Sequence, residues 1–182
     1  VSLANFTDLV TATDMQGHWL FAHQLLNSVV IALATTVLGV AFAATAAYAF
    51  SRFVFPGKKA GMNLLLTTQM FPGVVMTIPL YIIMDTVGLL DSLAGMALVY
   101  SATSVPFCVW MLKGYFDTIP RALEEAAVMD GMGRLQIFVR IVLPLARPGI
   151  VVTALFSFMT AWNEFILAAT FLSKPTLYTL PV

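Results

Sequence analysis

The sequence predicts an all-α protein, a bundle of about four transmembrane helices that forms a single domain over residues 1–182. Hydrophobic residues make up 60% of the chain and charged residues 10%, whereas about a quarter of the residues of a soluble domain are charged. Long uncharged runs separate the charged residues, and the basic ones gather in two loops. The formal net charge of zero excludes a basic field that would attract nucleic acid.

Three uncharged runs, and a fourth interrupted only by Asn163 and Glu164, predict the membrane-spanning helices. As a helix, residues 28–50 would rise about 34 Å, enough to cross a hydrocarbon core of about 30 Å. We place the spans at about residues 22–50, 62–84, 92–112 and 148–172, with a loop over 113–147 between the third and the fourth.

Basic residues predict the orientation of these spans. Eight of the nine lysines and arginines lie either just after the first span or in the 113–147 loop. Because lysine and arginine are retained on the cytoplasmic side, both regions are expected to face the cytoplasm. The segment that begins at Val1 would then lie outside, which needs at least one upstream span. We therefore expect a fragment of a multi-pass membrane protein.

Small, kinking and polar residues within the spans have packing and functional interpretations. The stripe of Thr35, Gly39, Ala43 and Ala47 predicts close packing against another helix. Pro72 and Pro79 predict kinks, which could also line a pathway.

Trp162, Asn163 and Glu164 are candidates for a substrate pathway, because a carboxylate within a span avoids lipid. Hydrogen bonding to neighbouring helices explains them equally well.

Other reactive side chains have structural explanations. Cys108 lies in an apolar run and is expected to be a packing residue. His18 and His23 lie near the predicted outer membrane edge and are expected to be polar anchors, so we expect no metal site.

The loop between the last two spans contains the sequence EEAAVMDG, residues 124–131. Thr118 and Pro120 predict the start of a short helix, and Gly131 and Gly133 predict its end. The following set of residues would share one shallow face at helical spacing: Leu123, Ala126, Ala127 and Asp130. A second amphipathic helix is predicted from Leu135, Phe138, Val139 and Val142, and Pro144 is expected to halt it.

These two helices could lie on a lipid surface or dock a cytoplasmic partner. A helix that binds lipid is expected to have a cationic polar face. The first helix instead carries Glu124, Glu125 and Asp130, which favours docking to a protein.

The spacing within the loop resembles a known family. Glu125-Ala126-Ala127, then Gly131, then Ile141-Val142-Leu143-Pro144 match the EAA loop of permease subunits of bacterial ATP-binding-cassette (ABC) importers. The flanking residues resemble the carbohydrate branch, in particular its maltose-permease-like second subunit: Asn27-Ser28, 46–50, Arg52-Phe53, 55–57, 113–116 and 162–165. The resemblance covers about residues 27–181.

The resemblance implies the fold of a type I ABC importer permease in the bacterial inner membrane, with the first and last spans missing here. Its coupling residues would be Glu124, Glu125, Ala126, Ala127, Asp130, Gly131, Ile141, Leu143 and Pro144. It implies as partners a cytoplasmic ATPase dimer, a second permease subunit and an external sugar-binding protein. The chain would bind no cofactor, because the ATPase subunits would bind ATP.

Two other functions remain alternatives. The first is a permease of an ABC importer for another small solute, such as an amino acid or a polyamine. The second is an ion-coupled secondary transporter, although Glu164 is alone within its span and no repeat is evident. An enzyme is not expected, because the sequence contains neither a P-loop motif nor a metalloprotease or serine-hydrolase motif.

Overall fold

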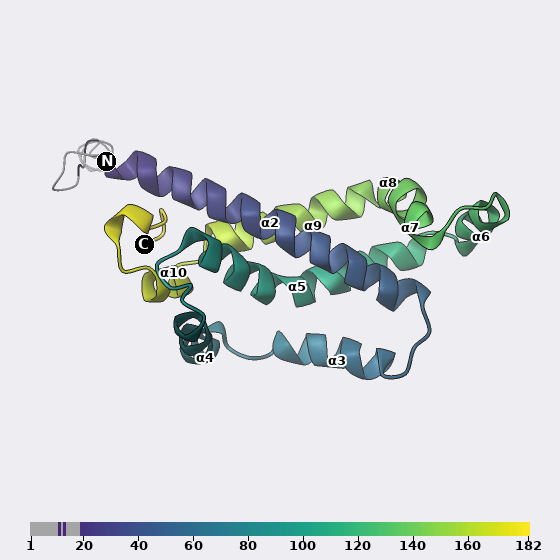
Figure 1. Ribbon diagram of the computed structural model, residues 1–182, viewed down its shortest axis with the longest axis horizontal. Coiled ribbons are helices and arrows are strands. Elements are labelled where there is room, and N and C mark those ends of the chain that lie inside the picture. Colours follow the sequence, from purple (N-terminus) through teal and green to yellow (C-terminus); the bar gives the residue numbers. More distant parts are fainter. Residues whose placement is uncertain (1–10, 12, 14–18) are drawn as a thin grey trace, which may run out of the picture. The chain divides into compact units, whose positions relative to one another are not determined.

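The computed structural model describes residues 11, 13 and 19–182, and within them the regular structure is helical apart from one bridge between Thr13 and Trp19 (Figure 1). The predicted all-α class is confirmed for this part of the chain. In chain order the elements are α2 (Leu20–Arg52), α3 (Lys58–Thr68), α4 (Gly73–Thr86), α5 (Leu93–Thr118), α6 (Arg121–Met129), α7 (Arg134–Ile137), the π-helix η1 (Phe138–Val142), α8 (Leu143–Leu145), α9 (Arg147–Trp162), α10 (Ile166–Phe171) and the 3-10 helix η2 (Pro175–Leu177).

The described chain forms two compact units, each built from segments that are distant in sequence. Unit 1 contains the residues up to Thr35 together with Pro72–Tyr100 and Phe158–Val182, and unit 2 contains Thr36–Phe71 and Ser101–Ser157. Each unit has its own buried apolar cluster.

Small residues allow the helices of unit 2 to approach closely. Gly39, Ala43 and Ala47 are all buried on α2. A Cβ atom added at Gly39 would lie 3.0 Å from Ser104 Oγ of α5 and 3.6 Å from Ser157 Oγ of α9. Since Thr35 is also buried, the packing stripe predicted along α2 is confirmed.

Hydrogen bonds hold the last residues of the chain within unit 1. The Asn27 Nδ2 group of α2 donates to the carbonyl oxygens of Thr176 and Tyr178, at 2.9 and 3.1 Å. The Leu180 amide donates to Ser28 Oγ at 2.8 Å. These bonds satisfy backbone groups of a segment that has little regular structure of its own.

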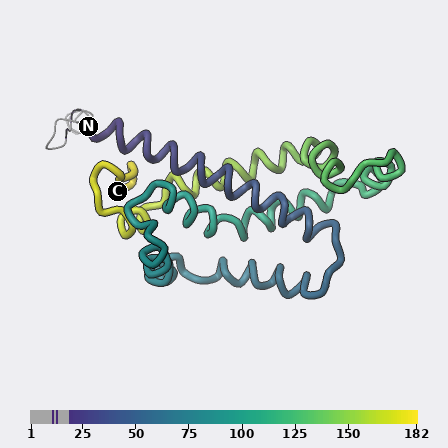
Figure 2. The backbone as a smooth tube through the Cα atoms, in the orientation of Figure 1, coloured from purple at the N-terminus to yellow at the C-terminus, as the bar shows by residue number. Residues whose placement is uncertain are grey.

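The predicted spans correspond to the helices to different degrees. α2 and α5 are each long and apolar enough to cross a membrane. The predicted range 62–84 is divided between α3 and α4 at Pro72, and the break is an uncoiled stretch of the tube in Figure 2. The range 148–172 is likewise divided between α9 and α10. Within the described residues there are two candidate spans, or up to four when α3 is joined to α4 and α7–α8 to α9.

The helix that contains Pro144 ends one residue after it, close to the position expected from sequence. The helical segment from Arg134 to Leu145 passes through Pro144 by way of the π-helix η1. There the Leu143 amide bonds to the Phe138 carbonyl, five residues earlier. A widened turn of this kind makes room where a proline ring would collide with the preceding turn of a regular α-helix. The helix ends at Leu145, one residue beyond the proline, and α9 begins at Arg147 after a bend of 77°.

Candidate functional site

The helix α6 begins after Pro120, which occupies the N-cap position with φ −60° and ψ 128°. Thr118, predicted to cap α6, instead donates its hydroxyl to the Tyr115 carbonyl at 2.7 Å, so that prediction is wrong. Thr118 is the last residue of α5, and its side chain bonds back to its own helix. Glu124 lies in the first turn of α6, where the helix dipole favours a negative charge.

Gly131 ends α6 in a left-handed conformation, as predicted for a turn residue. Its φ is 82°, and its amide donates to the Val128 carbonyl at 3.0 Å. The Met132 amide donates to the Ala127 carbonyl at 2.9 Å. This pair of bonds is a Schellman motif, which a left-handed residue at the first position after the cap makes possible. The turn reverses the chain so that α7 packs against α6.

The faces of α6 differ from the predicted shallow face. Ala127 is buried in the core of unit 2, whereas Leu123, Ala126 and Asp130 are exposed. The four positions keep their helical spacing, but Ala127 turns into the core while the other three stay exposed. The physical reason is the apolar cluster beneath α6, where a methyl side chain fits between the helix and its neighbours. Glu125 belongs to the exposed part of α6.

Glu124 faces inward rather than outward. Its Oε1 atom lies 2.5 Å from Arg52 Nε of α2, and the two side chains are only 13% and 7% exposed. The Tyr48 hydroxyl, also from α2, donates to Glu124 Oε2 at 3.2 Å. Both carboxylate oxygens of Glu124 are thus bonded within the chain. In this respect Glu124 differs from the neighbouring docking candidate Glu125, which is exposed.

The last three motif residues lie against the core of unit 2. Ile141 and Leu143 are partly buried and pack against the same apolar cluster as Ala127. Pro144 is also partly buried. Nearby, the Tyr48 ring lies 4.7 Å from the Phe138 ring, measured between centroids. This end of the motif therefore holds the loop on the helices beneath it.

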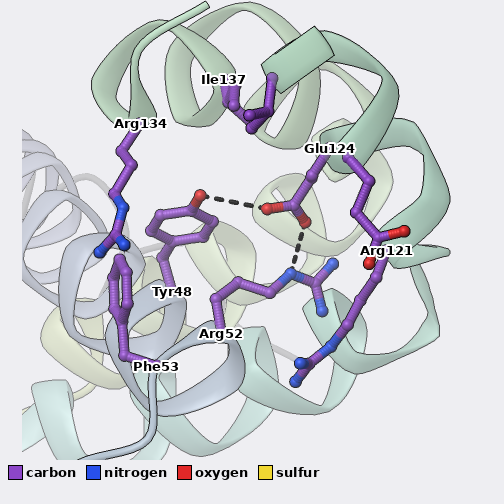
Figure 3. A pocket seen from close by; sticks show the side chains of 9 residues that line it. Tyr48, Arg52, Phe53, Arg121, Glu124, Arg134 and Ile137 are labelled. Carbon is purple, nitrogen blue, oxygen red and sulfur yellow. Dashed lines mark hydrogen bonds and ion pairs between the residues drawn. The ribbon is translucent and has the colours of Figure 1, made fainter.

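A pocket of about 300 Å³ lies beside the buried pair (Figure 3). Besides Glu124 and its two partners it is lined by Phe53, Arg121, Glu125, Val128, Arg134 and Ile137. The Arg134 guanidinium lies 5.0 Å from the centre of the Phe53 ring, within range of a cation–π interaction. Sequence reasoning used Arg52 for the orientation and Arg52-Phe53 for the resemblance, but it gave neither these residues nor Tyr48 a part in the site.

Trp162 is the last residue of α9, and Asn163 and Glu164 lie in the break between α9 and α10 in unit 1. Trp162 stacks on Phe158 with the ring centroids 5.6 Å apart. Asn163 is exposed, and its side-chain amide donates to the Met159 carbonyl at 2.7 Å. Glu164 Oε1 accepts a bond from the Leu167 amide at 3.0 Å and so caps the first turn of α10. The break combines a capped helix start with exposed hydrogen-bonding groups.

Metal ligands do not cluster in the part of the chain that the structure describes. Among those residues, no group of three or more histidine, cysteine, aspartate or glutamate side chains could hold a metal ion. His23 Nδ1 lies 3.0 Å from the Trp19 carbonyl oxygen, and His18 lies outside the described residues.

Comparisons with known proteins point to one family. Residues 35–182 match the sequence profile of the family described as the inner membrane component of binding-protein-dependent transport systems. An ABC transporter permease protein, ORF1, of Streptomyces antibioticus is 44% identical over 161 residues, which are 88% of this chain and 70% of that protein. The trehalose transport permease SugB of Mycobacterium tuberculosis is 39% identical over 163 residues, covering 90% of this chain and 60% of its own length.

A solved structure has the same fold. It is a crystal structure of a bacterial ABC transporter involved in the import of the acidic polysaccharide alginate, with a TM-score of 0.82 and 24% sequence identity. The match covers all of this chain and 60% of that one. The chain thus spans between 60% and 70% of the length of these three proteins.

Proposed function

Because the chain belongs to the family of inner membrane components of binding-protein-dependent transport systems, we propose that it forms part of the membrane pathway of an ATP-driven carbohydrate importer. The chain is a multi-pass inner-membrane protein of the ABC permease kind. The carbohydrate assignment draws support from the trehalose permease among its relatives. We further propose that ATP is bound and hydrolysed by a separate cytoplasmic subunit and that this chain binds no cofactor.

The arrangement of α6 carries the docking part of the proposal. Its inner face is held by Ala127 in the core and by the Glu124–Arg52 pair. Its outer surface presents Glu125 and Ala126, and Met129 at its end is 87% exposed. A short helix that is fixed on one side and exposed on the other can transmit a push from a partner. Glu125 would pair with a basic residue of the ATPase, and Ala126 would permit close seating.

On the substrate side, the break between α9 and α10 is the proposed contribution to the pathway. Trp162 provides an aromatic surface, and Asn163 and Glu164 provide hydrogen-bonding groups. Such groups suit a neutral, hydroxyl-rich solute. The importer would be completed by a second permease subunit and by an external binding protein that delivers the carbohydrate.

Charge reversal at Glu125 tests the docking role. In the intact importer, Glu125→Lys is expected to lower the amount of ATPase that purifies with the permease by at least about tenfold, because an attractive contact becomes repulsive. Insertion of the permease into membranes is expected to be unchanged, since Glu125 is exposed.

Asp85→Lys is the matched control, because Asp85 is an exposed carboxylate in α4, outside the loop. This variant is expected to retain the ATPase. Full retention of the ATPase by Glu125→Lys would contradict docking at α6, and uptake that proceeds without ATP would contradict the whole proposal.

A further inference from the structure

Within unit 2, the contact between α6 and α2 includes a buried ion pair. Both carboxylate oxygens of Glu124 are bonded by α2 side chains, one by Arg52 Nε at 2.5 Å and the other by the Tyr48 hydroxyl at 3.2 Å (Figure 3). The two charged side chains are at least 87% covered. A paired charge that is shielded from water in this way resists separation, because each partner would lose its compensation.

The other nitrogens of Arg52 extend the connection. Nη2 donates to the Ile119 carbonyl between α5 and α6 at 3.0 Å, and Nη1 donates to Ser51 Oγ at 3.1 Å. Ser51 Oγ in turn donates to Asp117 Oδ1 at the end of α5, at 2.6 Å. Arg52 is therefore bonded to α6, to the linker before it and, through Ser51, to α5.

A further hydrogen bond joins the start of α6 to the end of α2. Arg121 Nη2 donates to the Ser51 carbonyl at 3.1 Å. The cytoplasmic ends of two long helices and the first turn of α6 thus share one polar network.

Apolar packing and polar bonds both join α6 to α2. Ala127 of α6 lies in the same buried apolar cluster as Ala43, Ala44 and Ala47 of α2, while a pocket of about 300 Å³ lies beside the ion pair. At the pocket, the charged and polar bonds connect the first turn of α6 to the end of α2. A displacement of α6 consequently acts on Arg52, the last residue of α2.

Given the proposed function, we propose that Glu124 is a positioning residue that couples movement of α6 to α2 through Arg52, and that it does not contact the ATPase. Its neighbour Glu125 meets the partner, while Glu124 passes the movement into the membrane. Loss of the Glu124–Arg52 pair is therefore expected to leave the ATPase bound and active but to reduce the solute transported per ATP hydrolysed.

Glu124→Gln is the first test, in the intact importer reconstituted in proteoliposomes. The amide keeps the size of the side chain and leaves Arg52 without its charged partner. Solute transported per ATP is expected to fall by about tenfold, within the usual range of coupling between sites. The amount of ATPase that purifies with the permease is expected to stay within about twofold of that of the unsubstituted importer. The substitution is expected to weaken the coupling between the two subunits without weakening their binding.

A cross-link gives the second test. Arg52→Cys and Glu124→Cys are combined in a Cys108→Ala background and bridged with a short, reducible thiol reagent. The unbridged protein is expected to be uncoupled like Glu124→Gln, bridging is expected to restore transport per ATP, and reduction is expected to remove it again. Restored transport per ATP would show that coupling needs a physical connection between α2 and α6, and that the charges are not themselves required.

The results separate this inference from the proposed function. Unchanged transport per ATP in Glu124→Gln overturns the inference, as does loss of the ATPase in that variant, which would make Glu124 a docking residue. Failure of a bridged protein to recover also overturns it. If the unsubstituted importer shows no ATP-dependent uptake, the proposed function itself is wrong.

Discussion

Glu124 and Glu125 are adjacent, chemically identical side chains in opposite environments. Successive residues of an α-helix point about 100° apart, so turning Glu124 toward α2 leaves Glu125 outside. Glu124 is mostly buried against Arg52, whereas Glu125 is exposed. The sequence placed both in the 113–147 loop but could not distinguish them, because the difference depends on side chains more than 70 residues away.

Gly131 is the residue whose conformation most directly limits substitution. Its φ of 82° is costly for a residue with a Cβ atom, and open space around it means that the cost arises from the backbone alone. Gly131→Ala is expected to destabilise the end of α6 by about 1 kcal/mol. The Met132 amide, which donates across the turn, should then exchange with deuterium roughly fivefold faster.

Gly133→Ala is the control for this change. Gly133 has φ −74° and also lies in open space, so an added methyl group is expected to have little effect on the exchange of the Met132 amide. Equal acceleration in both variants would show that the left-handed turn is not what stabilises the end of α6.

At the scale of the elements, breaks and bends distinguish this chain from a row of uniform helices. Pro72 separates α3 from α4, as proline commonly does. Pro144 lies one residue before the end of α8, where the π-helix η1 makes room for its ring, and Pro79 and Pro106 lie inside α4 and α5. Proline alone therefore did not reveal which helix would end.

The break between α9 and α10 allows a discriminating substitution. Glu164 Oε1 accepts the Leu167 amide, a bond that a glutamine oxygen can also accept. The Glu164→Gln variant is therefore expected to retain most of the uptake rate. The Glu164→Ala variant is expected to have a lower rate than Glu164→Gln, because loss of a cap costs about 1 kcal/mol of helix stability. Initial uptake rates, normalised to permease in the membrane, measure both. Equal loss in the two variants would mean that the charge of Glu164, and not its cap, matters.

At the scale of the whole molecule, hydropathy predicted helices but not how they assemble. Unit 1 and unit 2 each combine segments from different parts of the chain. The apolar stretch 22–50, for example, contributes to both units through α2. A hydropathy pattern reports the average environment of each stretch and contains no information about its neighbours in space.

The proposed orientation of the chain can be tested by labelling. In a Cys108→Ala background, a single cysteine at Met129 is expected to react with a membrane-impermeant maleimide only after the cells are permeabilised, because the basic residues of its loop remain in the cytoplasm. A single cysteine at Val87, which is 58% exposed between α4 and α5, is expected to react in cells whose inner membrane is intact and whose outer layer alone has been permeabilised. The reverse labelling pattern would invert the topology and remove the basis for cytoplasmic docking.

The sequence by itself determined the all-α membrane character, the approximate extent of α2, the start of α5 and the turn at Gly131. These features depend on composition and on spacing within one helix, which are local. Tertiary structure alone decided that Ala127 and Glu124 face inward, because burial and ion pairing depend on which distant side chains meet. Arg52 and Glu124 are separated by 72 positions, and only the packing of α6 against α2 brings their charges together.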